Sequence, residues 1–112
     1  MILDKSLEYF VTFSEKDIEG LKNMFSDNVS LRDWEISVEG IDEVLKANQN
    51  IFDSVDTIVV KPIRVWDFLS QEDNVVVAEL EIVVNDEVTE LVTDILEFDD
   101  DEKIKSIRAY KG

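Results

Sequence analysis

The chain has 112 residues, of which 45% are hydrophobic and 34% charged, a composition typical of one soluble domain with a single core. Its formal net charge of −16 disfavours binding to nucleic acid and to anionic membranes. It contains no cysteine and no histidine, which excludes disulfides, thiolate chemistry and the commonest metal ligand and neutral-pH base. Acid–base chemistry must therefore come from carboxylates, tyrosine or lysine.

No apolar run approaches the ~20 residues that a membrane-spanning helix needs. The first ten residues, MILDKSLEYF, contain an early acid and no basic region followed by an apolar block. We therefore expect no membrane span and no signal peptide, and the cytoplasm as the location.

The N-terminal half predicts helices and a short strand. Apolar residues recur at helical spacing within residues 3–10 and 18–25, with Asp4 and Asp17 as the expected N-caps. The segment NVSLRDW alternates as a strand does. After Gly40, the segment IDEVLKANQNIF has the pattern of a third amphipathic helix.

From Asp56 onward the pattern changes to the period of two that is typical of strands. Short turns, NDE and DDDE, favour an antiparallel meander, and Pro62 indicates an edge position or a bulge. The expected strands are DTIVVKPIRVWDF, NVVVAELEIVV, VTELVTDILEF and KIKSIRAY.

This order of elements predicts one α+β domain over residues 1–112, with three N-terminal helices packed on a curved antiparallel sheet. A strongly curved sheet under helices forms a cone, and a cone can keep a hollow at its wide end. Such hollows are the usual sites of small-molecule binding.

The segments DIEGLKNMFSDNVSLRDW and DILEFDDDEKIKSIRAY resemble the second helix, first strand and closing hairpin of the nuclear transport factor 2-like (NTF2-like) superfamily. That superfamily includes ketosteroid isomerases and SnoaL-type polyketide cyclases. The resemblance covers essentially the whole chain and implies the cone-shaped, cystatin-like fold. The same fold hosts enzymes, carriers and dimerisation modules, so the resemblance does not specify a function.

Three residues match the catalytic groups of ketosteroid isomerases. Tyr9 matches the tyrosine that hydrogen-bonds the substrate oxyanion, Asp33 the aspartate base, and Asp94 the protonated aspartic acid that is the second oxyanion donor. The resemblance implies proton transfer next to a carbonyl, or aldol closure or hydration of a polyketide-like substrate with the same base. Trp34 replaces the family's proline and the loop at 35–39 is short, and both argue against a steroid-sized cavity.

Tyr9 and Asp33 also have structural interpretations. Asp33 shares a strand face with Leu31, yet an aspartate at a strand end also hydrogen-bonds loop amides or pairs with a cation. Tyr9 shares a helical stripe with Ile2 and Phe13, yet it could pack its ring and leave its hydroxyl at the surface.

Asp94 stands inside an apolar strand, where a carboxylate must be exposed, paired or neutralised by a raised pKa. A neutral carboxylic acid would be a hydrogen-bond donor. Alternatively, Arg64 or Arg108 pairs with Asp94, or its face of the sheet is the outer one.

Aromatic side chains are candidate ligand-binding walls of the pocket, with membership of the core as the alternative: Phe13, Trp34, Trp66 and Phe98. Asn48 lies close to the apolar stripe of the third helix, where a surface position is the simpler expectation. Glu79 and Glu81 alternate with apolar residues as on a solvated face, and we expect neither a metal nor a cofactor.

The strand at 74–84 is apolar on both faces, and helices can cover only one of them. We therefore expect a homodimer through the open face of the sheet. The expected ligand is small and apolar or carbonyl-containing, and neither nucleic acid nor a membrane is an expected partner. The alternative to an enzyme is a non-catalytic ligand-binding or dimerisation module whose cavity is filled by aromatic rings.

Overall fold

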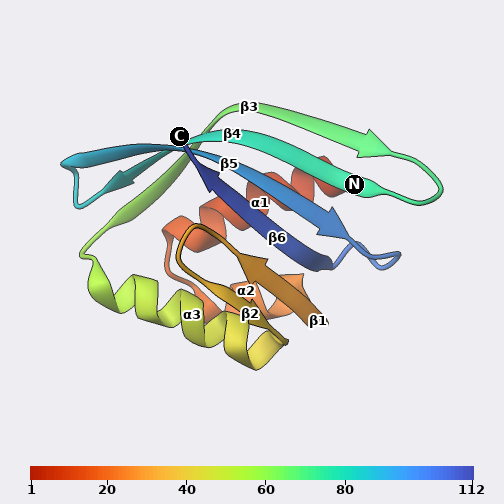
Figure 1. The fold of residues 1–112 in the computed structure, drawn as a ribbon, viewed down its shortest axis with the longest axis horizontal. Helices are drawn as coiled ribbons and strands as arrows, with labels where there is room; N and C mark the ends of the chain where they lie inside the picture. Colours follow the sequence, from red (N-terminus) through yellow and green to blue (C-terminus); the bar gives the residue numbers. More distant parts are fainter.

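Six strands form one curved sheet, and three helices lie against its inner face (Figure 1). The computed structural model describes all 112 residues. In chain order the elements are α1 (Ile2–Ser14), α2 (Ile18–Met24), β1 (Phe25–Arg32), β2 (Ser37–Glu39), α3 (Ile41–Ser54), β3 (Ile58–Leu69), β4 (Asn74–Val84), β5 (Val88–Phe98) and β6 (Ile104–Lys111). The predicted α+β class, with three helices on a curved sheet, is confirmed. No helix is both long and apolar enough to cross a membrane.

The sheet is mixed and has the strand order β2-β1-β6-β5-β4-β3. β3 to β6 form the predicted antiparallel meander, but β1 runs parallel to β6, with Leu31 beside Ile107. The short strand β2 pairs with β1 in a segment expected to be a loop. The prediction of a wholly antiparallel sheet is therefore corrected. Parallel strands are joined by long crossover connections and not by tight turns, so no local turn pattern in the sequence predicts their pairing.

The helix N-termini confirm one predicted cap and correct the other. The Asp17 carboxylate accepts a hydrogen bond from the Gly20 N–H at 3.0 Å, as an N-cap does. α1 begins earlier than expected, with Met1 as its N-cap, so that Asp4 lies in the first helical turn. There a negative charge still interacts favourably with the helix dipole.

A β-bulge in the edge strand β3 decides which of its side chains face the helices. Val60 faces them, and strict alternation would place Trp66 on the same side. The register shifts between Pro62 and Arg64, which reverses the alternation beyond that point. Trp66 therefore pairs with Val77 on the outer face and is 46% exposed. The prediction of Trp66 as a pocket wall is wrong for this reason.

The inner face of the sheet and the helices share one hydrophobic core. Its largest fully buried side chains come from all three helices and the central strands: Phe10, Leu21, Val44, Leu80, Leu96, Phe98, Ile104 and Ile107. Three of them, Phe10, Leu80 and Ile107, also line the space that is left open between α3 and the meander.

Lys16 fixes α3 over that space. Its ammonium donates to the carbonyl oxygens of Phe52, Val55 and Asp56, at 3.0, 2.7 and 2.9 Å. These carbonyls lie at the end of α3 and in the connection to β3, where the helix leaves carbonyl groups without partners. One side chain from the α1–α2 turn therefore sets where α3 ends against the sheet.

We expect Lys16→Met to lower the free energy of unfolding by about 1.5–3 kcal/mol, because hydrogen bonds from a charged donor are lost. Urea denaturation followed by circular dichroism measures this. Lys22→Met, on exposed α2 surface, is the control and should change stability by less than about 0.5 kcal/mol. Equal stability of the two variants would contradict the role of Lys16.

Candidate functional site

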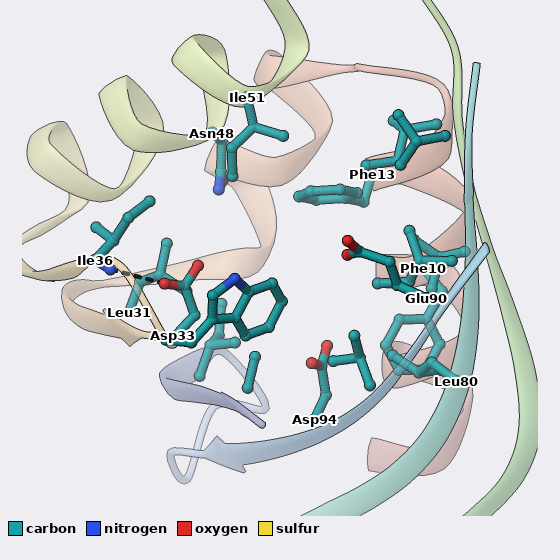
Figure 2. Close-up of a pocket in the computed structure, with 18 of the residues that line it drawn as sticks. Phe10, Phe13, Leu31, Asp33, Ile36, Asn48, Ile51, Leu80, Glu90 and Asp94 are labelled. Carbon is teal, nitrogen blue, oxygen red and sulfur yellow. Dashed lines mark hydrogen bonds between the residues drawn. The ribbon is translucent and has the colours of Figure 1, made fainter. Parts of the chain in front are cut away.

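A cavity of about 230 Å³ lies between α1, α3 and the inner face of the sheet (Figure 2). Sixteen of its 21 lining residues are hydrophobic. The others are the carboxyl groups of Asp33, Glu35, Glu90 and Asp94 and the amide of Asn48. The cavity is thus an apolar hollow with a few polar groups, as ligand sites generally are.

Asp94 enters the cavity from the middle of β5. Its neighbours across the sheet are Ala78 on β4 and Ala109 on β6, whose small side chains leave room beside the carboxyl group. Asp94 is only 9% exposed and takes part in none of the ion pairs of the chain. Burial, and secondly the negative charge of Asp33, raise the pKa of Asp94 to about 7. Around neutral pH, a large share of Asp94 is therefore a neutral acid that can donate a hydrogen bond.

Neither arginine considered as a partner of Asp94 reaches it. Arg108 lies opposite Ile95 on the outer face, where its guanidinium pairs with Glu97 at 2.6 Å. Arg64 is also on the outer face, opposite Glu79. Asp94 faces inward because the alternation of β5 is unbroken from Glu90 to Leu96.

Tyr9 is buried in α1 and lines the same cavity. Its ring lies among aromatic neighbours, with ring centroids 6.1 Å from Phe13 and 6.2 Å from Phe25. Burial, and secondly the nearby Asp94, raise the pKa of the Tyr9 phenol well above its usual range. The hydroxyl is therefore a permanent donor, and the alternative of a surface hydroxyl is wrong.

Asp33 follows the last residue of β1 and lines the cavity from its open side. Its Oδ1 accepts hydrogen bonds from the backbone N–H groups of Glu35 and Ile36, both at 2.7 Å. The second carboxylate oxygen is turned away from this loop toward the cavity (Figure 2). The loop contact and the cavity position, considered as alternatives for Asp33, thus occur together.

Two of the four aromatic residues predicted as ligand-binding line the cavity. Phe13 forms part of its wall, and Trp34 lies at its rim, 45% exposed, with the Lys111 ammonium 5.6 Å from the ring centroid. Phe98 shares the inward face of β5 with Asp94, but four residues along a strand are roughly 13 Å. Phe98 is therefore a core residue and not a wall of the cavity, and Trp66 is on the outer face.

Asn48 and Glu90 also line the cavity, although sequence reasoning did not place them there. The expected surface position of Asn48 is wrong: this residue is 1% exposed. Its spacing from Val44 and Ile51 was the signal that it lies on the inward row of α3. Glu90 lies four residues before Asp94 on the same face of β5, and its carboxylate pairs with the Lys111 ammonium at 3.2 Å.

The arrangement can accept a proton and stabilise an oxyanion. Asp33 has a carboxylate oxygen free to act as a base, while Tyr9 and neutral Asp94 are donors. No lining residue carries a positive charge, and the Lys111 ammonium beside the cavity is paired with Glu90, so the lining disfavours phosphate or carboxylate groups of a ligand. No three acidic side chains are grouped so as to hold a metal ion.

The family model for SnoaL-like domains matches residues 7–107 of the chain. No curated protein matches its sequence. Among solved structures, a provisionally assigned dehydratase of the NTF2-like family from Streptomyces avermitilis has a TM-score of 0.82 at 18% identity, over 96% of this chain and 91% of that one. A provisionally assigned ketosteroid isomerase from Kribbella flavida has a TM-score of 0.81 at 14% identity, over 97% and 76%.

AusH from Aspergillus nidulans has a TM-score of 0.82 at 13% identity, over 99% of this chain and 83% of that one. At such low identity these likenesses show a shared fold only. Together with a cystatin-like neighbour from Nostoc punctiforme, they confirm the NTF2-like, cystatin-like architecture.

The raised pKa of Asp94 predicts a pH-dependent effect of Asp94→Asn on stability. The folded chain keeps this proton up to about pH 7, while the unfolded chain loses it near pH 3.8. The group's contribution to stability is therefore fully present below pH 3.8 and falls as pH rises, until it is lost above about pH 7. Asparagine does not ionise, so the variant does not lose this contribution. Between pH 4 and pH 8, the free energy of unfolding of Asp94→Asn should therefore rise by about 4 kcal/mol relative to that of the native chain.

Urea denaturation of both proteins across this pH range measures the difference. Asp27→Asn, at an exposed site on β1, is the control and should follow the native curve. A native-minus-variant difference that is independent of pH would contradict a protonated Asp94.

Proposed function

This chain belongs to the family of SnoaL-like domains, and we propose that it moves a proton next to the carbonyl group of a small, uncharged ligand. The observation that supports this most is the convergence of one carboxylate and two neutral donors on an apolar cavity: Asp33, Tyr9 and Asp94. They come from the end of β1, from α1 and from β5. Asp33 can accept a proton, and Tyr9 and neutral Asp94 can donate hydrogen bonds to an oxyanion.

In the proposed reaction, the ligand's carbonyl oxygen accepts hydrogen bonds from Tyr9 and Asp94. The Asp33 carboxylate removes a proton from the carbon next to the carbonyl, and the electron pair of that C–H bond moves onto the oxygen to give an enolate. Asp33 then returns the proton to another carbon. The two donors stabilise the charge as it develops on the oxygen, which is usually the largest contribution in such reactions.

The cavity limits the ligand in size and charge. Its 230 Å³ is below the roughly 300 Å³ at which drug-sized sites begin, which favours a molecule of about one ring. The acidic lining disfavours anions. Aldol closure or hydration would use the same base, and the isomerase and dehydratase assignments among neighbours of this fold are compatible with either reaction.

Isomerisation of cyclohex-3-en-1-one to the conjugated enone, followed by ultraviolet absorbance, tests the proposal. We expect Asp33→Asn to lower kcat/KM by about 10²–10⁴, because the base is lost while the amide oxygen still accepts the loop N–H bonds. Asp27→Asn is the matched control and should keep the native rate. If native and Asp33→Asn protein both showed only the background rate, the proposed isomerase activity would be contradicted.

We also propose a homodimer through the outer face of the sheet, which would serve an enzyme or a module without turnover equally. Trp66, Val77, Ile95 and Arg108 form one row across four strands of this face. Other large side chains are exposed on the outer face: Phe68, Leu91 and Tyr110. A contiguous apolar patch with aromatic residues and arginine is typical of a protein interface.

Light scattering should give a mass of twice the 12.9 kDa of one chain at micromolar concentration. Trp66→Glu should produce the monomer, since a buried charge would lie at the centre of the interface. Leu7→Glu, at an exposed apolar position on α1, is the control and should remain dimeric. A native monomer would contradict the proposed interface.

A further inference from the structure

We infer that Asn48 binds a second oxygen of the ligand, so that the natural ligand is a small neutral molecule with two oxygen functions. One would be the carbonyl at Tyr9 and Asp94, and the other a hydroxyl or second carbonyl at Asn48. This inference rests on the proposed use of the cavity and adds the class of ligand to it.

Asn48 is a polar residue in an otherwise apolar row of α3. The row comprises Val44, Asn48 and Ile51, and Asn48 is 1% exposed. Its Oδ1 is buried without any hydrogen-bond partner. Burying an amide with unmet hydrogen-bonding capacity opposes folding. Its Oδ1 can be satisfied only by a donor, which a hydroxyl group on the ligand would supply, whereas its N–H groups can donate to either a hydroxyl or a carbonyl oxygen.

The amide is directed at the site of the chemistry. Figure 2 shows its nitrogen pointing from α3 into the cavity, while Asp94 enters from the sheet on the opposite side. No hydrogen bond joins Asn48 to Asp33 or to another lining residue in that view. An N–H donor of Asn48 is thus available to an acceptor atom in the cavity, across from the proposed oxyanion donors.

The acceptor on the ligand must be an uncharged oxygen. The lining carries no cation, and its carboxylates are Asp33, Glu35 and Glu90, of which Glu90 is paired with Lys111. A carboxylate or phosphate on the ligand would meet their repulsion, whereas a hydroxyl or ketone oxygen pairs with an amide N–H without that cost. A volume of about 230 Å³ places the two oxygens on or near a single ring.

Cyclohexanone and cyclohexane-1,4-dione test the inference, because they differ by one carbonyl oxygen. Titration followed by nitrogen–proton NMR measures both affinities and observes the side-chain amide of Asn48, whose signal is identified by its loss in Asn48→Leu. We expect the native protein to bind the dione about tenfold more tightly, the gain of one hydrogen bond. Only the dione should shift the Asn48 amide signal.

Asn48→Leu should remove the preference for the dione and leave cyclohexanone binding unchanged. Asn50→Leu, at an exposed position on the same helix, is the matched control and should keep the preference. Asn48→Leu should also be at least as stable as the native chain, since it deletes an unpartnered amide. A large loss of stability would show that the amide is structural and would overturn the inference.

The outcomes separate this inference from the proposed reaction. Equal affinities for the two ketones in the native protein would overturn the role of Asn48 and leave the reaction standing. A dione that shifts the Asn48 signal, in a protein that isomerises cyclohex-3-en-1-one only at background rate, would support the inference and reject the reaction. Failure of both ketones to bind at tens of millimolar would overturn both.

Discussion

The desolvation of one carboxyl group is the constraint on which the chemistry of this cavity depends. Asp94 faces inward between two alanines, with no cation near enough to pair with it. The sheet therefore holds an acid in surroundings that favour its neutral form. The same low polarity keeps the Tyr9 phenol protonated. Two donors are thereby provided without a metal ion, a histidine or a positive charge.

Asp33 completes the arrangement, and its surroundings differ from those of Asp94. Its carboxylate lies at the open side of the cavity, and two backbone N–H groups bind one of its oxygens. Asp33 thus lies in a hydrogen-bonded position at the end of β1, whereas Asp94 is buried in the middle of β5.

Three features help to keep the cavity open: the contacts of Lys16, the bulge in β3 and the rim position of Trp34. Lys16 fixes the end of α3 through three carbonyl groups. The bulge in β3 turns Trp66 to the outer face, so that its indole does not occupy the inner one. Trp34 lies at the rim beside Lys111. Of the two indoles, only that of Trp34 lines the hollow, and the rest of the lining is mainly aliphatic and aromatic side chains around a small set of polar ones.

By itself, the sequence determined the class of fold, the order of the helices and long strands, and which residues of β5 share a face, because each follows from local periodicity that burial enforces over many residues. From that face and the family resemblance, Tyr9, Asp33 and Asp94 could be named as one candidate set. Only the tertiary structure decided the parallel pairing of β1 with β6, the outward turn of Trp66, the distance of Phe98 from the cavity and the burial of Asn48. The physical reason is that the pairing and the turn of Trp66 depend on register between segments far apart in the chain and on a one-residue bulge, which leave no periodic signal. The spacing of Asn48 indicates its helix row, but only packing decides that this row meets the hollow.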